Sequence, residues 1–193
     1  MEYYYESNNE CDNHVQIQLL VNEYINADDV VLELWAGSGI ISCTINNKLN
    51  NKYNQVSVEP NQKNWNSLEK NKKNNKCNFN IIKGFISDKK FNIINTGNGT
   101  MFVEDGDTNI QSITLDQVED KYNLKFNVLV ADCEGFLEIF FDENPQLYNE
   151  LRLIIYEKDC KEKCNYEKIQ NELKNNGFCL KKRLKQKYYI WIK

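Results

Sequence analysis

The order of apolar and polar positions along the chain separates short buried strands from helices. Short apolar runs, which are typical of parallel strands covered on both faces, occupy 30–35, 55–60, 78–83, 126–132 and 151–157. Segments that we interpret as helices lie between or beside them, at 14–24, 40–45, 62–75, 134–141 and 166–176. This alternation predicts an α/β domain built on a mostly parallel sheet.

Two regions depart from the alternation. Residues 88–115 contain short apolar runs separated by Gly97, Gly99 and Gly106, which favours short antiparallel strands or a small β-rich insertion. The runs at 178–184 and 188–193 are joined by a very short polar link, which predicts an antiparallel C-terminal hairpin. No linker is visible, so we expect one domain over 1–193, with 1–29 as an N-terminal helical segment.

Composition narrows the function classes. The formal net charge is −4, whereas binding along a nucleic-acid backbone needs a basic face, so a nucleic-acid partner is not expected. Seven cysteines and one histidine form no complete zinc set, so we expect reduced thiols and no metal site. No apolar run reaches transmembrane length, and the acidic N-terminus is unlike a signal peptide. We therefore expect a cytoplasmic protein without membrane insertion.

The informative chemistry lies where the first two strands end. The first apolar run leads into ELWAGSG at 33–39, in which Gly37 and Gly39 allow a sharp turn and a close backbone approach to a ligand. Glu59 ends the second strand, and a carboxylate there can accept hydrogen bonds from both hydroxyls of a ribose. Together these residues predict a nucleoside-cofactor site at the carboxyl ends of the strands.

At these positions the chain resembles the class I methyltransferases that use S-adenosyl-L-methionine. The narrower resemblance is to the FkbM family, and it rests on VLELWAGSG, VEPNQKNWNSL, SITLDQV, VADCEG and LIIYEKD, in this order. It implies a Rossmann-like fold with a seven-stranded sheet, helices on both faces and an antiparallel end hairpin. It also implies methyl transfer from S-adenosyl-L-methionine to a hydroxyl of a sugar, a glycan or another small molecule.

The resemblance also assigns roles to residues. The implied cofactor contacts are Glu33, Trp35, Ala36, Gly37, Ser38 and Gly39 in the first turn, Glu59, Pro60 and Asn61 after the second strand, and Phe85, Ile86 and Ser87 beside the adenine. The candidates for the base that removes the acceptor proton are Asp132, Glu134 and Glu157, at the ends of the fourth and fifth strands. The chain departs from the family pattern at Trp35, which replaces a glycine, and at Val130, which replaces a lysine.

Several alternatives stay open. One is an RNA methyltransferase on the same scaffold, and another is a catalytically inactive binding module with this fold. A metal-dependent variant is also open, because Asp132, Glu157 and Asp159 could supply oxygen ligands. His14 is a further candidate base, Asp116 is interpreted as a helix cap, and the lysine-rich segment 181–187 is interpreted as a solvated face.

Overall fold

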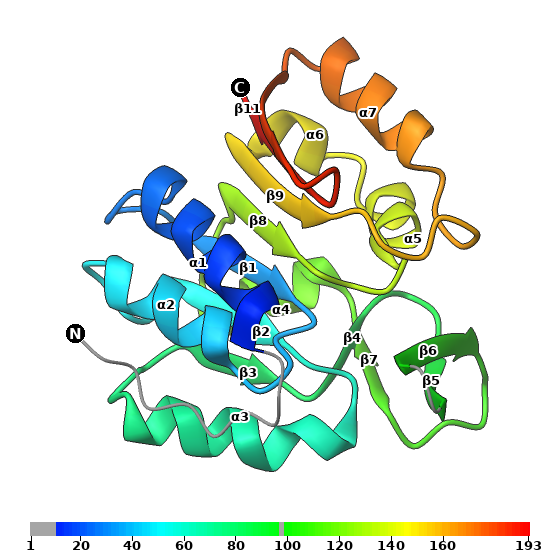
Figure 1. Ribbon diagram of the computed structural model, residues 1–193. Coiled ribbons are helices and arrows are strands. Elements are labelled where there is room, and N and C mark those ends of the chain that lie inside the picture. The colour runs from blue at the N-terminus through cyan, green and yellow to red at the C-terminus, as the bar shows by residue number, and fades with distance from the viewer. Residues whose placement is uncertain (1–10, 97–98) are drawn as a thin grey trace.

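A seven-stranded sheet forms the centre of the computed structural model, which describes residues 11–96 and 99–193 (Figure 1). Its strands run in the order β10-β11-β9-β8-β1-β2-β3. They are β1 (Val31–Leu34), β2 (Gln55–Val58), β3 (Asn80–Ile82), β8 (Val128–Ala131), β9 (Leu153–Glu157), β10 (Cys179–Leu184) and β11 (Tyr188–Ile192). All neighbours pair in parallel except β11, which runs antiparallel to both β9 and β10. The predicted mostly parallel sheet with a C-terminal hairpin is confirmed.

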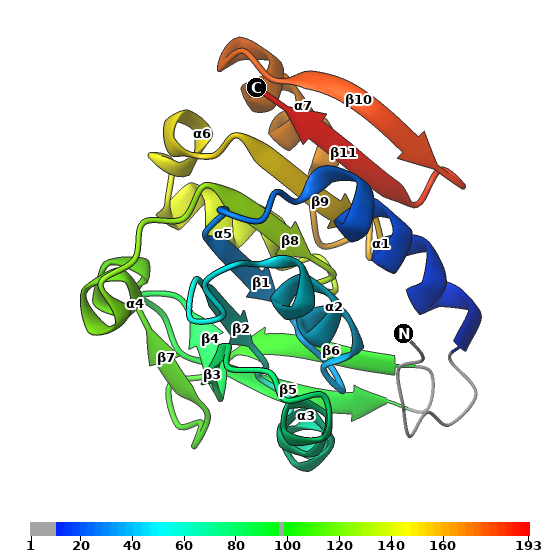
Figure 2. The ribbon, with the colours of Figure 1, turned by 90° about the vertical axis from the view of Figure 1, so that its left-hand side faces the viewer.

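Helices cover both faces of this sheet (Figure 2). One face carries α1 (Cys11–Tyr24) and α2 (Ile40–Lys48), with α3 (Gln62–Asn74) beside α2. The other face carries α4 (Leu115–Tyr122), α5 (Leu137–Glu143), α6 (Leu147–Glu150) and α7 (Tyr166–Asn175). Among the described residues, none of these helices combines the length and the apolar character that a bilayer crossing requires.

Side-chain alternation along the central strands explains why their sequences are mostly apolar, with Glu33 of β1 and Gln55 and Ser57 of β2 as buried polar exceptions. In β1, Val31 packs in the core beneath α1 and α2, whereas Leu32 packs in the core on the opposite face. In β8, Val128 and Leu129 divide between the two cores in the same way. A strand that is covered on both faces favours apolar residues on both, which removes the alternating pattern of a half-exposed strand.

The pattern missed two helices, α4 and α6, and misassigned one cap. Thr114, not Asp116, caps α4: its hydroxyl accepts a hydrogen bond from the Gln117 N–H, and the Gln117 side chain accepts one from the Thr114 N–H. Such a capping box satisfies two otherwise free donors, so Asp116 is left in the first helical turn, where its charge suits the helix dipole.

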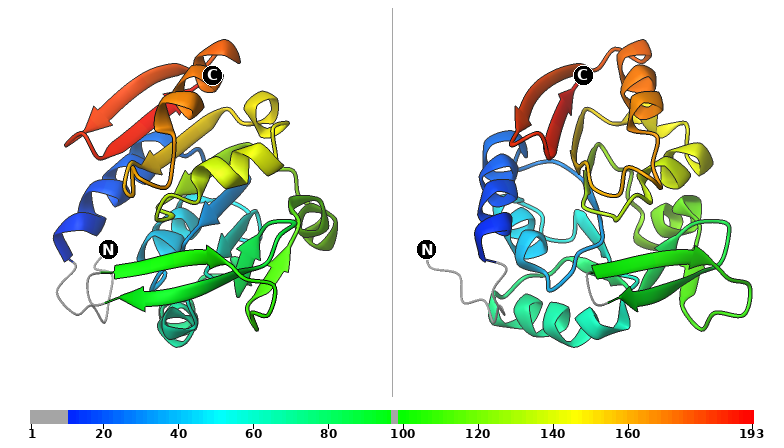
Figure 3. Two further views of the ribbon diagram at one scale, coloured as in Figure 1. Left: turned by 90° about the vertical axis from the view of Figure 1, so that its right-hand side faces the viewer. Right: turned by 45° about the vertical axis from the view of Figure 1, so that its right-hand side comes forward.

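The region after β3 forms two small sheets apart from the main one (Figure 3). β4 (Gly84–Ile86) pairs in parallel with β7 (Gln111–Ile113), a parallel pair where the sequence favoured antiparallel strands. β5 (Phe91–Thr96) and β6 (Gly99–Glu104) form an antiparallel hairpin between them. Phe91 and Phe102 of this hairpin are buried in the main core, so the hairpin is anchored to the body of the protein.

The β4–β7 pairing supplies a test of the fold. A Cβ atom at Gly84 would lie 2.1 Å from the backbone oxygen of Gln111, so Gly84→Ala must push the two strands apart. Overpacking of this kind costs about 3 kcal/mol, which corresponds to a decrease in Tm of about 6–12 °C for a domain of this size. Gly106→Ala is the matched control, because a Cβ there has no neighbour within 4 Å. Equal melting temperatures of the two variants in calorimetry would contradict the pairing.

Candidate functional site

A cavity of about 560 Å³, called the rim cavity below, lies at the carboxyl ends of β1, β2, β8 and β9. Ten of the fifteen site residues expected from the sequence line it. They are Glu33, Trp35, Ala36, Gly37, Ser38, Glu59, Asn61, Asp132, Glu134 and Glu157. In open α/β sheets, ligands bind outside the carboxyl ends of the strands, so this position is the expected one for a ligand.

Glu59 holds together the elements that form the floor of the rim cavity. Its side chain is 1% exposed, and its two carboxylate oxygens accept hydrogen bonds from the backbone N–H groups of Gly37 (2.6 Å) and Asn61 (2.7 Å). Its own backbone oxygen accepts a hydrogen bond from the indole of Trp65. Burial raises the pKa of Glu59 to about 7, although the two N–H donors oppose that rise. The acid thus links β2, the glycine turn after β1 and the start of α3.

The glycine turn is shaped for a ligand that approaches the backbone closely. Gly37 has a φ of 57°, and a Cβ atom placed on it would have no heavy atom within 4 Å, so the space beside it is open. The backbone oxygen of Ser38 accepts a hydrogen bond from Asn71 of α3, which holds the turn in place. The open space beside Gly37 and the acid next to it fit the ribose and methionine parts of the predicted cofactor.

Glu33 lies deeper in the same wall, on β1. It is 2% exposed, and it accepts a hydrogen bond from the hydroxyl of Ser57 on the neighbouring strand at 2.6 Å. Gln55 donates to the same hydroxyl at 3.0 Å and so holds it in place. Burial raises the pKa of Glu33 to about 7. The hydrogen bonds lower the pKa, but their effect is smaller than that of burial. Glu33 therefore changes its charge near neutral pH.

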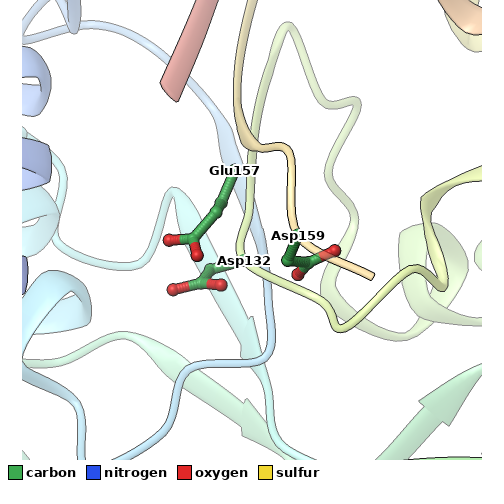
Figure 4. A group of neighbouring side chains, drawn as sticks. All are labelled: Asp132, Glu157 and Asp159. Atoms are coloured by element: carbon green, nitrogen blue, oxygen red, sulfur yellow. The ribbon is translucent and has the colours of Figure 1, made fainter. Parts of the chain in front are cut away.

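Three carboxylates gather at the ends of β8 and β9, where the sequence placed the catalytic base. Asp132 and Glu157 lie side by side and point the same way, whereas Asp159 turns to the other side (Figure 4). Burial raises the pKa of Asp132 well above its usual value, and the charges of Glu157 and Asp159 add to the rise. Glu157 is 6% exposed, and Lys187 contacts its carboxylate at 2.6 Å. Burial disfavours the charge of Lys187, but its contact with Glu157 outweighs this and raises its pKa.

These carboxylates could in principle hold a divalent cation, because one oxygen from each lies within 4.8 Å of the others. Two of the three already have strong partners. Asp159 accepts hydrogen bonds from the Tyr166 hydroxyl (2.6 Å) and from the Glu134 N–H (2.7 Å), which fixes the loop after β8. The charge of Glu157 is already neutralised by Lys187, which occupies the position beside this carboxylate. This arrangement leaves Asp132 as the carboxylate of the three that is most available to a substrate.

Five of the expected site residues do not line the rim cavity. Gly39 packs its backbone against Leu68 of α3, where a Cβ atom would meet a side-chain carbon at 2.7 Å. Pro60 is buried just behind Glu59. The prediction that Phe85, Ile86 and Ser87 contact adenine does not agree with this geometry, because they are 0%, 1% and 3% exposed and lie in and after β4. The five expected residues that do not line the rim cavity are therefore Gly39, Pro60, Phe85, Ile86 and Ser87.

An aromatic cluster explains the burial of that segment. The rings of Trp35, Phe85 and Phe136 lie 5.1–5.5 Å apart, and Phe91 and Phe102 complete the cluster. Trp35 adopts a φ of 60°, which is unusual for a bulky residue, and its indole reaches from the rim cavity into this cluster. Within the described part of the chain, its buried indole N–H has no acceptor. Ser87 lies beyond the cluster, where its hydroxyl donates to Glu143 at 2.8 Å.

Sequence reasoning missed several residues that line the rim cavity. They are Ile17, Leu34, Ile40, Ile41, Lys63, Asn64, Asn95, Thr100, Lys187 and Tyr188, together with Val130. Lys187 belongs to the lysine-rich segment that we interpreted as solvated, and no motif distinguishes it from its neighbours. Asn95 and Thr100 lie on the β5–β6 hairpin, whose path cannot be read from periodicity. The side chain of His14 lies outside the described residues.

Comparison of the whole structure with solved structures finds several methyltransferases among the similar structures. A precorrin-6y C5,15-methyltransferase from Geobacter metallireducens is similar, with a TM-score of 0.63 and 13% identity over 98% of this chain and 93% of that one. A ribosomal protein L11 methylase from Lactobacillus delbrueckii subsp. bulgaricus has a TM-score of 0.58 and 16% identity over 94% of this chain and 78% of that one. The fold is that of the Rossmann-like methyltransferases.

A third similar structure is a putative RNA methyltransferase from Pyrococcus horikoshii. It has a TM-score of 0.54 and 14% identity, and the match covers 100% of this chain and 88% of that one. No protein-family model and no curated protein sequence matches the chain. The resemblance to the FkbM family therefore stays a prediction, and the shared fold leaves the acceptor open.

The raised pKa of Glu33 predicts how stability depends on pH. Between its usual value of 4.5 and its folded value of about 7, the unfolded chain has lost the proton that the folded chain keeps. The free energy of unfolding therefore falls as the pH rises through this window. Glu33→Gln removes the effect, and we expect it to be more favourable relative to wild type at pH 8 than at pH 4.5, by up to about 3 kcal/mol.

Urea denaturation of the ligand-free protein at both pH values measures this difference. Glu69→Gln is the control, because Glu69 is exposed and contacts only the exposed Lys83 among the described residues. The same pH dependence in Glu33→Gln and wild type would show that Glu33 does not carry the effect. Glu59 and Asp132, whose pKa values are also raised, contribute to the pH dependence that remains in the variant.

Proposed function

We propose that this chain binds S-adenosyl-L-methionine in the rim cavity and transfers its methyl group to a hydroxyl oxygen of a small molecule or glycan. The observation that carries the proposal is the Glu59 carboxylate, which is held by the N–H groups of Gly37 and Asn61 beside open space at Gly37. This geometry offers a fixed acceptor for ribose hydroxyls next to a backbone that a ligand can approach closely. The shared methyltransferase fold supports it.

The cofactor, when bound, supplies an electrophilic methyl group on a positively charged sulfur. The residues of the chain have to orient an acceptor and take its proton. Asp132 is the proposed base, because its carboxylate lines the rim cavity and its raised pKa makes the carboxylate a stronger base than an exposed aspartate. Glu157, held by Lys187, positions the acceptor beside it, and Glu134 lies in the wall on the same side.

Charge favours an acceptor that is not an anion. The rim cavity is lined by five carboxylates and by two lysines, Lys63 and Lys187. Lys187 is committed to Glu157, so a phosphate group would meet uncompensated negative charge. This argues for a neutral hydroxyl compound over RNA. RNA remains the second candidate, because a similar structure is that of a putative RNA methyltransferase.

Binding of the cofactor product is the first test. Gly37→Ala would place a methyl group in the open space of the rim cavity, and we expect it to weaken binding of S-adenosylhomocysteine by at least about 10-fold in calorimetry, the loss that about 1.4 kcal/mol of steric repulsion causes. Gly177→Ala is the matched control, because Gly177 also has a positive φ but lies outside the rim cavity. Both variants pay about 1–2 kcal/mol for the left-handed backbone. No binding by wild type, or equal binding by both variants, would refute the proposal.

Turnover tests the assignment of the base. Asp132→Asn keeps the shape of the side chain but cannot accept a proton, so we expect methyl transfer to fall by about 10²-fold or more while S-adenosylhomocysteine still binds. Transfer from radiolabelled S-adenosyl-L-methionine into a pool of glycans and small metabolites measures this. Asp120→Asn, on the exposed side of α4, is the control.

The same assay distinguishes the alternatives. Undiminished transfer by Asp132→Asn would exclude Asp132 as the base. Loss of transfer with EDTA, restored by Mg²⁺, would show instead that Asp132, Glu157 and Asp159 hold a divalent cation. Transfer into RNA in place of small molecules would select the second candidate.

A further inference from the structure

The β5–β6 hairpin reaches the rim cavity with two polar residues that face each other across its strands. Asn95 of β5 pairs with Thr100 of β6, and both line the rim cavity. Neighbouring residues on the other face of the hairpin, Ile94 and Met101, are exposed. Successive side chains alternate between the faces of a strand, so Asn95 and Thr100 lie on the opposite face, which borders the rim cavity and on which Asn95 is solvent-exposed and Thr100 half-buried.

The face of the hairpin that borders the rim cavity is held rigidly at its other end. Phe91 and Phe102 lie on the same face as Asn95 by strand alternation, and their rings pack 5.8 Å apart. Both rings also contact Phe136, at 5.2 Å each, in the core under the loop after β8. The position of Asn95 is therefore set by core packing and not only by its own hydrogen bonds.

A single residue connects this polar pair to the acid of the proposed ribose site. The Asn61 side-chain nitrogen donates to the Asn95 oxygen (2.9 Å) and to the Thr100 hydroxyl (3.3 Å). The backbone N–H of Asn61 donates to Glu59. Its side-chain oxygen caps α3 by accepting from the Lys63 N–H, so the amide cannot be turned the other way. Asn61 thus fixes the spacing between Glu59 and the hairpin.

The segment that the resemblance placed beside adenine is not available for this role. Phe85 and Ile86 are fully buried in β4, and the Ser87 hydroxyl donates to Glu143 outside the rim cavity. Beside Glu59, the polar residues that line the rim cavity are Asn61, Lys63 and Asn64 at the start of α3, and Asn95 and Thr100 on the hairpin.

We propose that the β5–β6 hairpin recognises the adenine base of the cofactor through Asn95 and Thr100, with Asn61 as the positioning residue. This inference rests on the proposed function. The Asn95 oxygen accepts from Asn61 and keeps a second lone pair for the adenine amino group. The Asn95 side-chain nitrogen has no acceptor among the described residues, so it is free to donate to a ring nitrogen of the base.

This pairing distinguishes adenine from 6-oxopurines. An asparagine amide matches the adjacent donor and acceptor of adenine, whereas hypoxanthine carries an oxygen in place of the amino group. That oxygen would face the Asn95 oxygen, and neither could donate. A good bidentate pair contributes discrimination of about 10-fold to 100-fold, so the hairpin makes the site selective for an adenine nucleoside.

Calorimetric titration of the full chain with S-adenosylhomocysteine and with S-inosylhomocysteine tests the inference. We expect wild type to prefer the adenine compound by about 10-fold or more. Asn95→Ala should weaken binding of the adenine compound about 10-fold to 100-fold and remove the preference. Asn61→Ala should reduce the preference as well, because Asn95 loses its positioning bond. Asn92→Ala, on the same strand but on the opposite face, should leave both affinities as in wild type.

The outcomes separate this inference from the proposed function. If wild type binds neither compound, the proposed function fails. Two outcomes would show that the hairpin does not recognise the base: wild type binds the adenine compound without preferring it, or Asn95→Ala keeps the preference. In either case the proposed function stands. The ratio of the two affinities is the decisive quantity, because a general loss of folding would lower both affinities without changing their ratio.

Discussion

The two hydrogen bonds to the buried Glu59 carboxylate are the constraint on which the site depends. A carboxylate that is 1% exposed is costly unless each oxygen has a donor, and the N–H groups of Gly37 and Asn61 supply these donors. The two donors come from different elements, the turn after β1 and the start of α3. Satisfying one side chain therefore sets the relative position of the glycine turn, the second strand and the third helix, which together form the floor of the rim cavity.

The same region keeps unfavourable electrostatic energy in the ligand-free protein. Glu33, Glu59 and Asp132 all have raised pKa values, because burial disfavours their charged forms; repulsion from Glu33 adds to the rise for Glu59, and repulsion from Glu157 and Asp159 adds to it for Asp132. A ligand that brings a positive charge and hydrogen-bond donors would relieve this strain, and a sulfonium with a ribose has both. Within the described chain, Lys187 is the one cation that forms a salt bridge with a carboxylate of the rim cavity, and its partner is Glu157, beside Asp132.

Packing decides which side of the rim cavity is open. The aromatic cluster of Trp35, Phe85, Phe91, Phe102 and Phe136 fills the space beneath the loops after β1 and β8. It buries the segment after β3 and anchors the β5–β6 hairpin, so the hairpin replaces that segment as the wall beside Glu59. Trp35 has a positive φ, which is unusual for a bulky residue, and its indole extends into the cluster.

The sequence by itself determined the succession of the main-sheet strands and of most helices along the chain, and it placed Gly37, Glu59, Asp132 and Glu157 in one site. It could do so because strand periodicity is local and because the carboxyl ends of parallel strands meet at one edge of a sheet. Only the tertiary structure brought in Lys187, from the end hairpin, and Asn95, from the β5–β6 hairpin, and only it removed Phe85 and its neighbours from the site. These positions depend on how distant segments pack, and packing between distant segments leaves no period in the sequence.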